Sequence, residues 1–124
     1  MMTRVKFCGL THRDDVAEAV ESGADALGFV FYESSARYVT PEQASELTRI
    51  VPAFITRVGL FVDADAALVK GIFHHAGLNL VQYHGNESSE FCDSVGLPYI
   101  KAFRVRPGIN ILAEMERYPN ALGF

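Results

Sequence analysis

Five times in succession, the chain passes from a short apolar run of strand length to a longer stretch with helical spacing. A continuous apolar run is typical of a parallel strand covered on both faces, because an antiparallel strand with one wet face alternates apolar and polar residues. Successive strand–helix–strand repeats build right-handed βαβ units. The chain is therefore predicted to form an α/β fold with a parallel sheet, whose strands cover residues 5–8, 26–32, 57–62, 80–84 and 99–105.

The stretches between these runs carry helix signals. Thr40 suits the N-cap, Pro41 suits the first helical position, and Gln43 can complete a capping box with Thr40. Gly23 and Gly77 follow helical spacing at positions where a helix commonly ends. The predicted helices cover residues 14–22, from 41 onward, from 63 or 65 to 75, from 88 or 89 to 96, and 109–118.

Two architectures use such a succession. A flavodoxin-like doubly wound sheet has five strands and suits 124 residues, whereas a (β/α)8 barrel typically has about 250 residues. The last four residues, 121–124, form one more apolar run with no helix after it. A doubly wound domain normally closes with a helix, so this run favours a (β/α)8 TIM-barrel type chain that covers about five βα units and the start of strand 6. We expect one incomplete barrel domain over residues 1–124.

Composition excludes several other classes of protein. With 49% hydrophobic residues the chain can bury a core, and no apolar run approaches the roughly 18 residues of a membrane span. The net charge of -4 gives no basic face for nucleic acid. Cys8 and Cys92 are too few for a disulfide framework, and residues 1–6 lack the apolar segment of a signal peptide. We therefore expect a cytoplasmic protein with neither a nucleic-acid nor a membrane partner.

Reactive groups in a parallel α/β protein gather where the strands end, in the loops that lead to the helices. Cys8 ends the first predicted strand, as either a small buried hydrophobe or a thiolate that acts as base or nucleophile. Lys6 lies two residues earlier on the same face. It either pairs with a carboxylate from another strand or supplies positive charge beside Cys8.

Polar side chains also follow three other strands. Arg37 lies among the small residues 34–36, as either a solvated loop charge or a bidentate partner for a carboxylate or phosphate. Gln82 and His84 share one face of a strand, where a polar pair is costly in a plain core, so a ligand-facing role is as plausible as a structural one. Asp63 ends the third predicted strand.

Other residue patterns carry little chemistry. Cys92 follows Phe91 inside a predicted helix and is interpreted as packing. His74 and His75 are adjacent on a helix, so they point about 100° apart and make a poor chelating pair. No metal-ligand spacing, nucleophile elbow, Gly-x-Gly-x-x-Gly motif or P-loop occurs. We expect no metal and no cofactor.

Six blocks together resemble one family, the phosphoribosylanthranilate isomerases of tryptophan biosynthesis. The blocks match in order and spacing along the whole chain: VKFCGLT (5–11), GADALGFVFY (23–32), SSARY (34–38), RVGLFV (57–62), VQYHG (81–85) and IKA (100–102). Each block is weak alone, but the ordered set is specific. The resemblance implies a (β/α)8 barrel and an Amadori rearrangement of a phosphorylated sugar–anthranilate, an aminoaldose becoming an aminoketose without cofactor or metal.

The resemblance also implies roles for residues. Cys8 matches the family's general base, and Arg37 matches the arginine that binds the anthranilate carboxylate. Gln82 and His84 match positions that line the pocket, and Lys6 joins them as a substrate-binding residue. The family's general-acid aspartate lies just beyond the position of Phe124, and its phosphate-binding loops come later still. Asp63 could replace that acid by position alone, so we expect the chain as given to be inactive or impaired.

Two alternatives remain beside the isomerase interpretation. One is a compact flavodoxin-like binding or signalling module without catalysis, although Cys8 and residues 9–11 stand where it would carry an acidic cluster or phosphate loop. The other is a half-barrel fragment that self-associates to cover its open sheet edges. For a complete isomerase we expect a monomer, and for this chain self-association is an open possibility.

Overall fold

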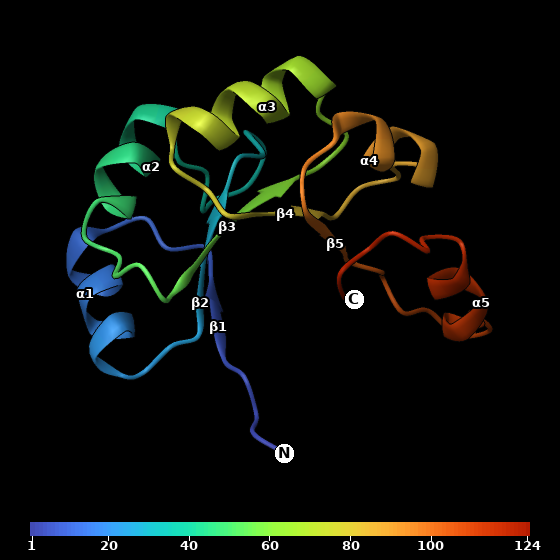
Figure 1. The fold of residues 1–124 in the computed structure, drawn as a ribbon, viewed down its shortest axis with the longest axis horizontal. Coiled ribbons are helices and arrows are strands. Elements are labelled where there is room, and N and C mark those ends of the chain that lie inside the picture. Colours follow the sequence, from blue (N-terminus) through green and yellow to red (C-terminus); the bar gives the residue numbers. More distant parts are fainter.

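The computed structural model describes residues 1–124 and has five strands that alternate with five helices. They follow one another as β1 (Lys6–Cys8), α1 (Arg13–Glu21), β2 (Ala26–Val30), α2 (Pro41–Thr48), β3 (Thr56–Phe61), α3 (Ala66–His75), β4 (Leu80–Tyr83), α4 (Ser89–Val95), β5 (Tyr99–Lys101) and α5 (Ile111–Glu116) (Figure 1). All neighbouring strands are parallel. The predicted α/β fold with a parallel sheet is confirmed.

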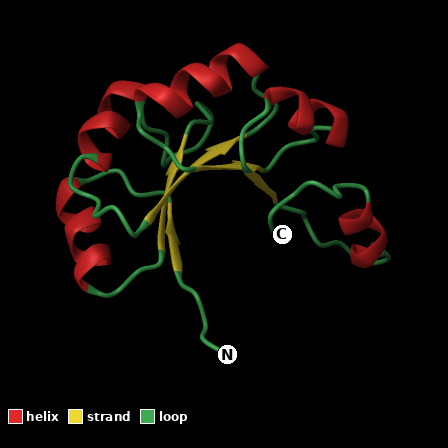
Figure 2. Cartoon of the chain, viewed as in Figure 1, coloured by secondary structure: helices red, strands yellow, loops and turns green.

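The strands lie in the order β1-β2-β3-β4-β5, so each strand pairs with the next one in the sequence. A doubly wound sheet reverses its strand order partway, so the flavodoxin-like alternative is wrong. The helices lie along the outer side of a curved sheet and leave its inner side bare (Figure 2). This arrangement is an arc of a parallel barrel that does not close on itself, with β1 and β5 at its two edges.

The register of the strands separates the two faces of the sheet, because paired residues of parallel neighbours direct their side chains to the same side. One set of partners faces the helices and supplies large side chains to the buried core: Leu27, Phe29, Phe61, Val81, Tyr83 and Tyr99. The other set lies on the inner, concave face: Cys8, Gly28, Val58 and Leu80 in one row, and Val30, Leu60, Gln82 and Ile100 in the next.

Helix α2 begins as the sequence predicts. The Gln43 backbone N–H donates to Thr40 Oγ1 at 3.2 Å, and the Thr40 N–H donates to Gln43 Oε1 at 2.9 Å, which completes the capping box behind Pro41. Asp65 and Ser88 cap α3 and α4 with one bond each, since their side chains accept from the N–H groups of Leu68 and Phe91. These caps fix where the helices leave the loops that follow the strands.

The largest errors in the predicted boundaries lie at the ends of strands, and α5 is also shorter than the predicted 109–118. Strand β2 ends at Val30 and not at 32, and β5 ends at Lys101 and not at 105. Residues 121–124 form no strand, although Leu122 N–H donates to the Tyr99 carbonyl and Lys101 N–H donates to the Gly123 carbonyl. These two bonds do not extend into a ladder, so the apolar pattern overstates the strand. None of the helices has the length and apolarity needed to span a membrane.

Candidate active site

The carboxyl ends of the parallel strands meet at one edge of the sheet, and Cys8 stands at this edge as the last residue of β1. It pairs with Gly28 of β2, where an added Cβ would lie 3.2 Å from Cys8 Sγ and 3.3 Å from Lys6 Cε. The absence of a side chain at Gly28 therefore leaves the space that Cys8 and Lys6 occupy. Both residues are half-buried and share the concave face, as the sequence predicts.

The loop after β2 brings Arg37 to Cys8. Arg37 Nη1 donates to the Cys8 carbonyl at 3.0 Å, and the Arg37 N–H donates to Ser35 Oγ at 3.1 Å. The side chain crosses Gly9, whose φ of +84° favours glycine and whose Cβ would lie 2.5 Å from Arg37 Cδ. The structure forms three salt bridges and Arg37 is in none of them. Its guanidinium therefore has donors left for an anion.

Gln82 lies on the concave face between Leu60 of β3 and Ile100 of β5. Its Oε1 is buried and accepts no hydrogen bond. A buried amide oxygen without a donor costs free energy, on the order of 1–3 kcal/mol. Gln82 is thus an unsatisfied acceptor on the same face as Cys8.

His84 directly follows β4. Its N–H donates to the Phe61 carbonyl at 2.9 Å, so it continues the pairing of β4 with β3 by one hydrogen bond. It lines a cavity of about 620 Å³ together with Asp63 and Arg104. Burial lowers the pKa of His84 below its usual 6.5, and the positive charges of Arg104 and Lys101 lower it further. The imidazole is therefore neutral at pH 7 and offers one donor and one acceptor to the cavity.

Asp63 lines the same cavity but is held by the neighbouring loop. Its φ is +51°, its N–H donates to Glu87 Oε2 at 2.9 Å, and its Oδ1 accepts from the Asn86 N–H at 2.7 Å. The carboxylate thus ties the loop after β3 to the loop after β4.

The predicted site residues therefore fall into two groups. Cys8, Lys6 and Arg37 gather at the ends of β1 and β2, whereas His84 lines the cavity beyond β3 to β5. Gln82 lies on the concave face between the groups. The first group does not line this cavity.

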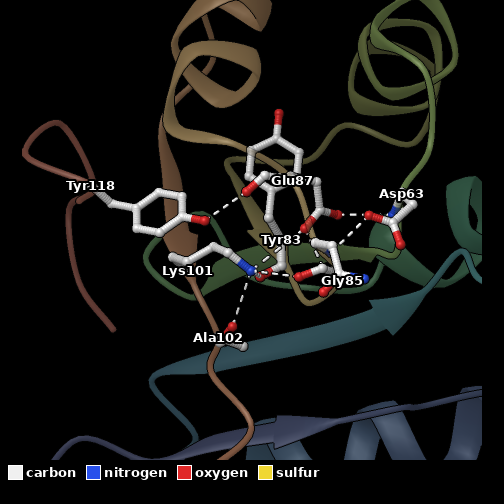
Figure 3. A network of polar contacts seen from close by, with 8 residues as sticks. Asp63, Tyr83, Gly85, Glu87, Lys101, Ala102 and Tyr118 are labelled. Atoms are coloured by element: carbon white, nitrogen blue, oxygen red, sulfur yellow. Dashed lines mark hydrogen bonds and ion pairs between the residues drawn. The ribbon is translucent and has the colours of Figure 1, made fainter. Parts of the chain in front are cut away.

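Sequence reasoning missed Glu87 and Lys101, which form a buried ion pair with Lys101 Nζ 3.5 Å from Glu87 Oε1 (Figure 3). Their side chains are 2% and 3% exposed. A signal was present, because a lysine between Ile100 and Ala102 interrupts an otherwise apolar strand. A charge in such a run is rarely tolerated unless it is paired.

The other cysteine and the two adjacent histidines lie where the sequence predicts. Cys92 is fully buried in the core, and burial raises its pKa to about 12. His74 and His75 are exposed at the end of α3. No group of three or more His, Cys, Asp or Glu residues is arranged to hold a metal ion.

The fold and the position of these side chains define a class: a parallel (β/α) barrel chain with polar residues at the carboxyl ends of its strands. The family model of N-(5′-phosphoribosyl)anthranilate (PRA) isomerase matches residues 5–123. The chain belongs to the PRA isomerase family.

Relatives of known family match the sequence of this chain over nearly its whole length. The N-(5′-phosphoribosyl)anthranilate isomerase of Nitrosospira multiformis is 50% identical over 123 residues, which are 99% of this chain and 59% of the relative. That of Chromohalobacter salexigens is 50% identical over 121 residues, which are 98% of this chain and 56% of the relative. The chain thus spans less than two thirds of the length of these relatives.

Solved structures give the same fold. Phosphoribosyl anthranilate isomerase from Thermus thermophilus superposes with a TM-score of 0.88 at 37% identity, over 95% of this chain and 59% of that one. The enzyme from Thermotoga maritima gives 0.85 at 42% identity, over 94% and 56%. A phosphoribosyl anthranilate isomerase has also been solved in complex with reduced 1-(o-carboxyphenylamino)-1-deoxyribulose 5-phosphate, again with a TM-score of 0.85 and 42% identity, over 94% and 59%.

Proposed function

We propose that these 124 residues carry the base and the carboxylate anchor of an isomerase acting on N-(5′-phosphoribosyl)anthranilate. The observation that carries the proposal is the juxtaposition of Arg37 and Cys8, whose carbonyl accepts from the guanidinium at 3.0 Å. The Amadori rearrangement needs an acid that protonates the furanose ring oxygen and a base that removes the C2′ proton from the ring-opened Schiff base. The resulting enolamine then becomes the aminoketose.

In this proposal the thiolate of Cys8 takes the C2′ proton and becomes the thiol, because Cys8 lies on the concave face at the carboxyl end of a strand. Arg37 receives the anthranilate carboxylate, since a planar guanidinium fork suits a planar carboxylate and no acidic side chain occupies it here. The two residues then orient the aminosugar so that its C2′ faces the thiol.

The remaining lining residues satisfy the polar atoms of the sugar. Gln82 Oε1 lacks a donor, which a substrate hydroxyl would supply. Neutral His84 adds a donor and an acceptor at the cavity. Lys6 adds positive charge beside Cys8 that suits an anionic substrate.

Binding of reduced 1-(o-carboxyphenylamino)-1-deoxyribulose 5-phosphate, measured by calorimetry, tests the anchor. Arg37→Lys should weaken binding about tenfold or more, because a charge-assisted bidentate contact is worth ~1.5–3 kcal/mol and an ammonium cannot reproduce it. Arg13→Lys, which makes the same change on the exposed surface of α1, is the control. Equal affinity of the Arg37→Lys variant and the wild-type chain would refute the assignment.

Turnover by the 124 residues alone is a separate prediction. None of the side chains that the register places on the concave face is a carboxylic acid, so the thiol has no acid partner there. We expect the substrate to disappear slowly or not at all, as monitored by its fluorescence. Turnover at a rate typical of enzymes, about 1 s⁻¹ or faster, would contradict this expectation.

A further inference from the structure

Glu87 joins two strand ends with one carboxylate. It lies in the loop between β4 and α4, where its Oε1 accepts from the Gly85 N–H at 2.8 Å and its Oε2 from the Asp63 N–H at 2.9 Å (Figure 3). Both oxygens are therefore used by backbone donors from different loops. The Tyr118 hydroxyl donates to the Glu87 carbonyl at 2.7 Å and ties this loop to the segment after α5.

Lys101 holds the same loop from β5. Its Nζ donates to the carbonyls of Gly85 at 2.8 Å, Ala102 at 3.1 Å and Tyr83 at 3.4 Å. The ammonium also lies 5.6 Å from the centre of the Phe103 ring and 5.7 Å from that of Tyr118. All of its donors are directed at fixed acceptors, although it is almost completely buried.

His84 stands between the two backbone positions that the pair holds. Lys101 binds the carbonyls of Tyr83 and Gly85, the residues on either side of His84. Glu87 binds the Gly85 N–H. A Cβ at Gly85 would lie 2.6 Å from Asp63 Oδ1 and 2.8 Å from the Asp63 backbone nitrogen, so the two loops are packed as closely as glycine allows.

Stability alone is a weak reason for such a pair. Desolvation of two buried charges offsets most of their attraction, and well-packed apolar residues of the same volume are often as stable or more so. An apolar pair would not hold the N–H groups of Asp63 and Gly85. What the ion pair adds is a fixed geometry at the ends of β3 and β4.

We propose that Glu87 and Lys101 are positioning residues of the candidate site, which together fix the loops after β3 and β4 and so set where His84 stands in the cavity. Their relevance to isomerisation rests on the proposed function. The positioning itself is a property of the folded chain and is measured without substrate.

The test compares the double variant Glu87→Gln/Lys101→Met with the wild-type chain by amide hydrogen exchange and by NMR titration of the His84 ring. The double variant removes one charge of each sign, so it leaves no unpaired buried charge. Glu90→Gln/Lys70→Met makes the same changes at exposed positions of α4 and α3 and is the matched control.

In the double variant, the amides of Asp63 and Gly85 should exchange about tenfold faster or more, while those of β2 keep their rates. The His84 titration midpoint should rise toward 6.5, because a mobile imidazole is better hydrated and the Lys101 charge that lowers its pKa is removed. Arg104 and Lys6 remain in place as the other charges that act on this ring.

A folded double variant with unchanged exchange and unchanged titration would overturn the proposal. A double variant that fails to fold would overturn it too, because the pair would then be a requirement of the fold. Neither measurement involves isomerase chemistry, so either result leaves the isomerase proposal standing. Conversely, unchanged analogue binding by the Arg37→Lys variant would refute the proposed carboxylate anchor and leave this result intact.

Discussion

The two cysteines differ in environment and should differ in reactivity. Cys8 is half-buried at the open concave face, whereas Cys92 is fully buried and burial raises its pKa to about 12. Because the thiolate is the reactive form, iodoacetamide at pH 8 should label Cys8 and leave Cys92 unmodified in the folded chain. Mass spectrometry of the labelled peptides measures this.

Bound reduced analogue should also protect Cys8 from the label, and Cys92 serves as the internal control. Labelling of Cys92 before global unfolding would contradict its burial in the core. If saturating analogue did not protect Cys8, the placement of the ligand over β1 would be contradicted.

At the scale of a single residue, the sequence pattern predicted that Lys6 shares a face with Cys8, because alternation along a strand decides which side chains share a face. It did not predict that Arg37 lies beside Cys8, because Arg37 comes from the loop after β2. It did not locate Glu87, which lies in the loop after β4 and pairs with Lys101 at the end of β5. Such pairing depends on register between strands, and hydrophobic periodicity along one strand carries no information about its neighbour.

Helix α2 illustrates what local signals determine at the scale of an element. Thr40→Ala removes the side-chain acceptor of the Gln43 N–H and should lower the free energy of unfolding by about 1 kcal/mol. Urea denaturation measures the loss, and Thr3→Ala, at an exposed position before β1, is the control. A loss equal to that of the control would show that the capping box does not stabilise the helix.

Elements were predicted well where their signals are local and poorly where they depend on neighbours. Caps such as Thr40 and Ser88 act within one turn of helix, so the starts of α2 and α4 follow from the sequence. The end of β5 depends on what pairs beside it. The Ala102 N–H still donates to the Tyr83 carbonyl at 2.9 Å, but the apolar residues Phe103 and Val105 lie beyond the end of the strand.

For the whole molecule, stability should depend on pH in two ranges. His84 has a lowered pKa in the folded chain, so below about pH 6.5 the unfolded chain binds a proton that the folded chain does not, and stability falls as the pH drops. Cys92, Tyr83 and Tyr99 have raised pKa values. Above about pH 9 the unfolded chain loses protons first, and stability falls again.

Urea unfolding between pH 5 and pH 10 should therefore give a maximum between these ranges. His84→Gln should flatten the acidic side only, since glutamine does not titrate. If the His84→Gln variant lost stability at acidic pH as the wild-type chain does, another group would be the cause of that loss.

The open arc also predicts the behaviour of the chain in solution. Strand β1 pairs only with β2, and Phe7 beside this edge is 41% exposed. An unpaired edge with apolar neighbours favours association between copies. Light scattering should therefore report a mass above that of one chain which falls on dilution, and Phe7→Lys should lower it. A concentration-independent monomer would contradict this expectation.

The sequential strand order has a consequence for how the chain folds. The most extensive contacts join each strand to the next strand, α2 to α3, and α3 to α4. A molecule built this way is close to a one-dimensional array, in which structure grows outward from any formed unit and frays from its two ends. Short loop closures should make assembly fast, and β3, which has strands on both sides and helices behind it, should be the last element to lose its structure.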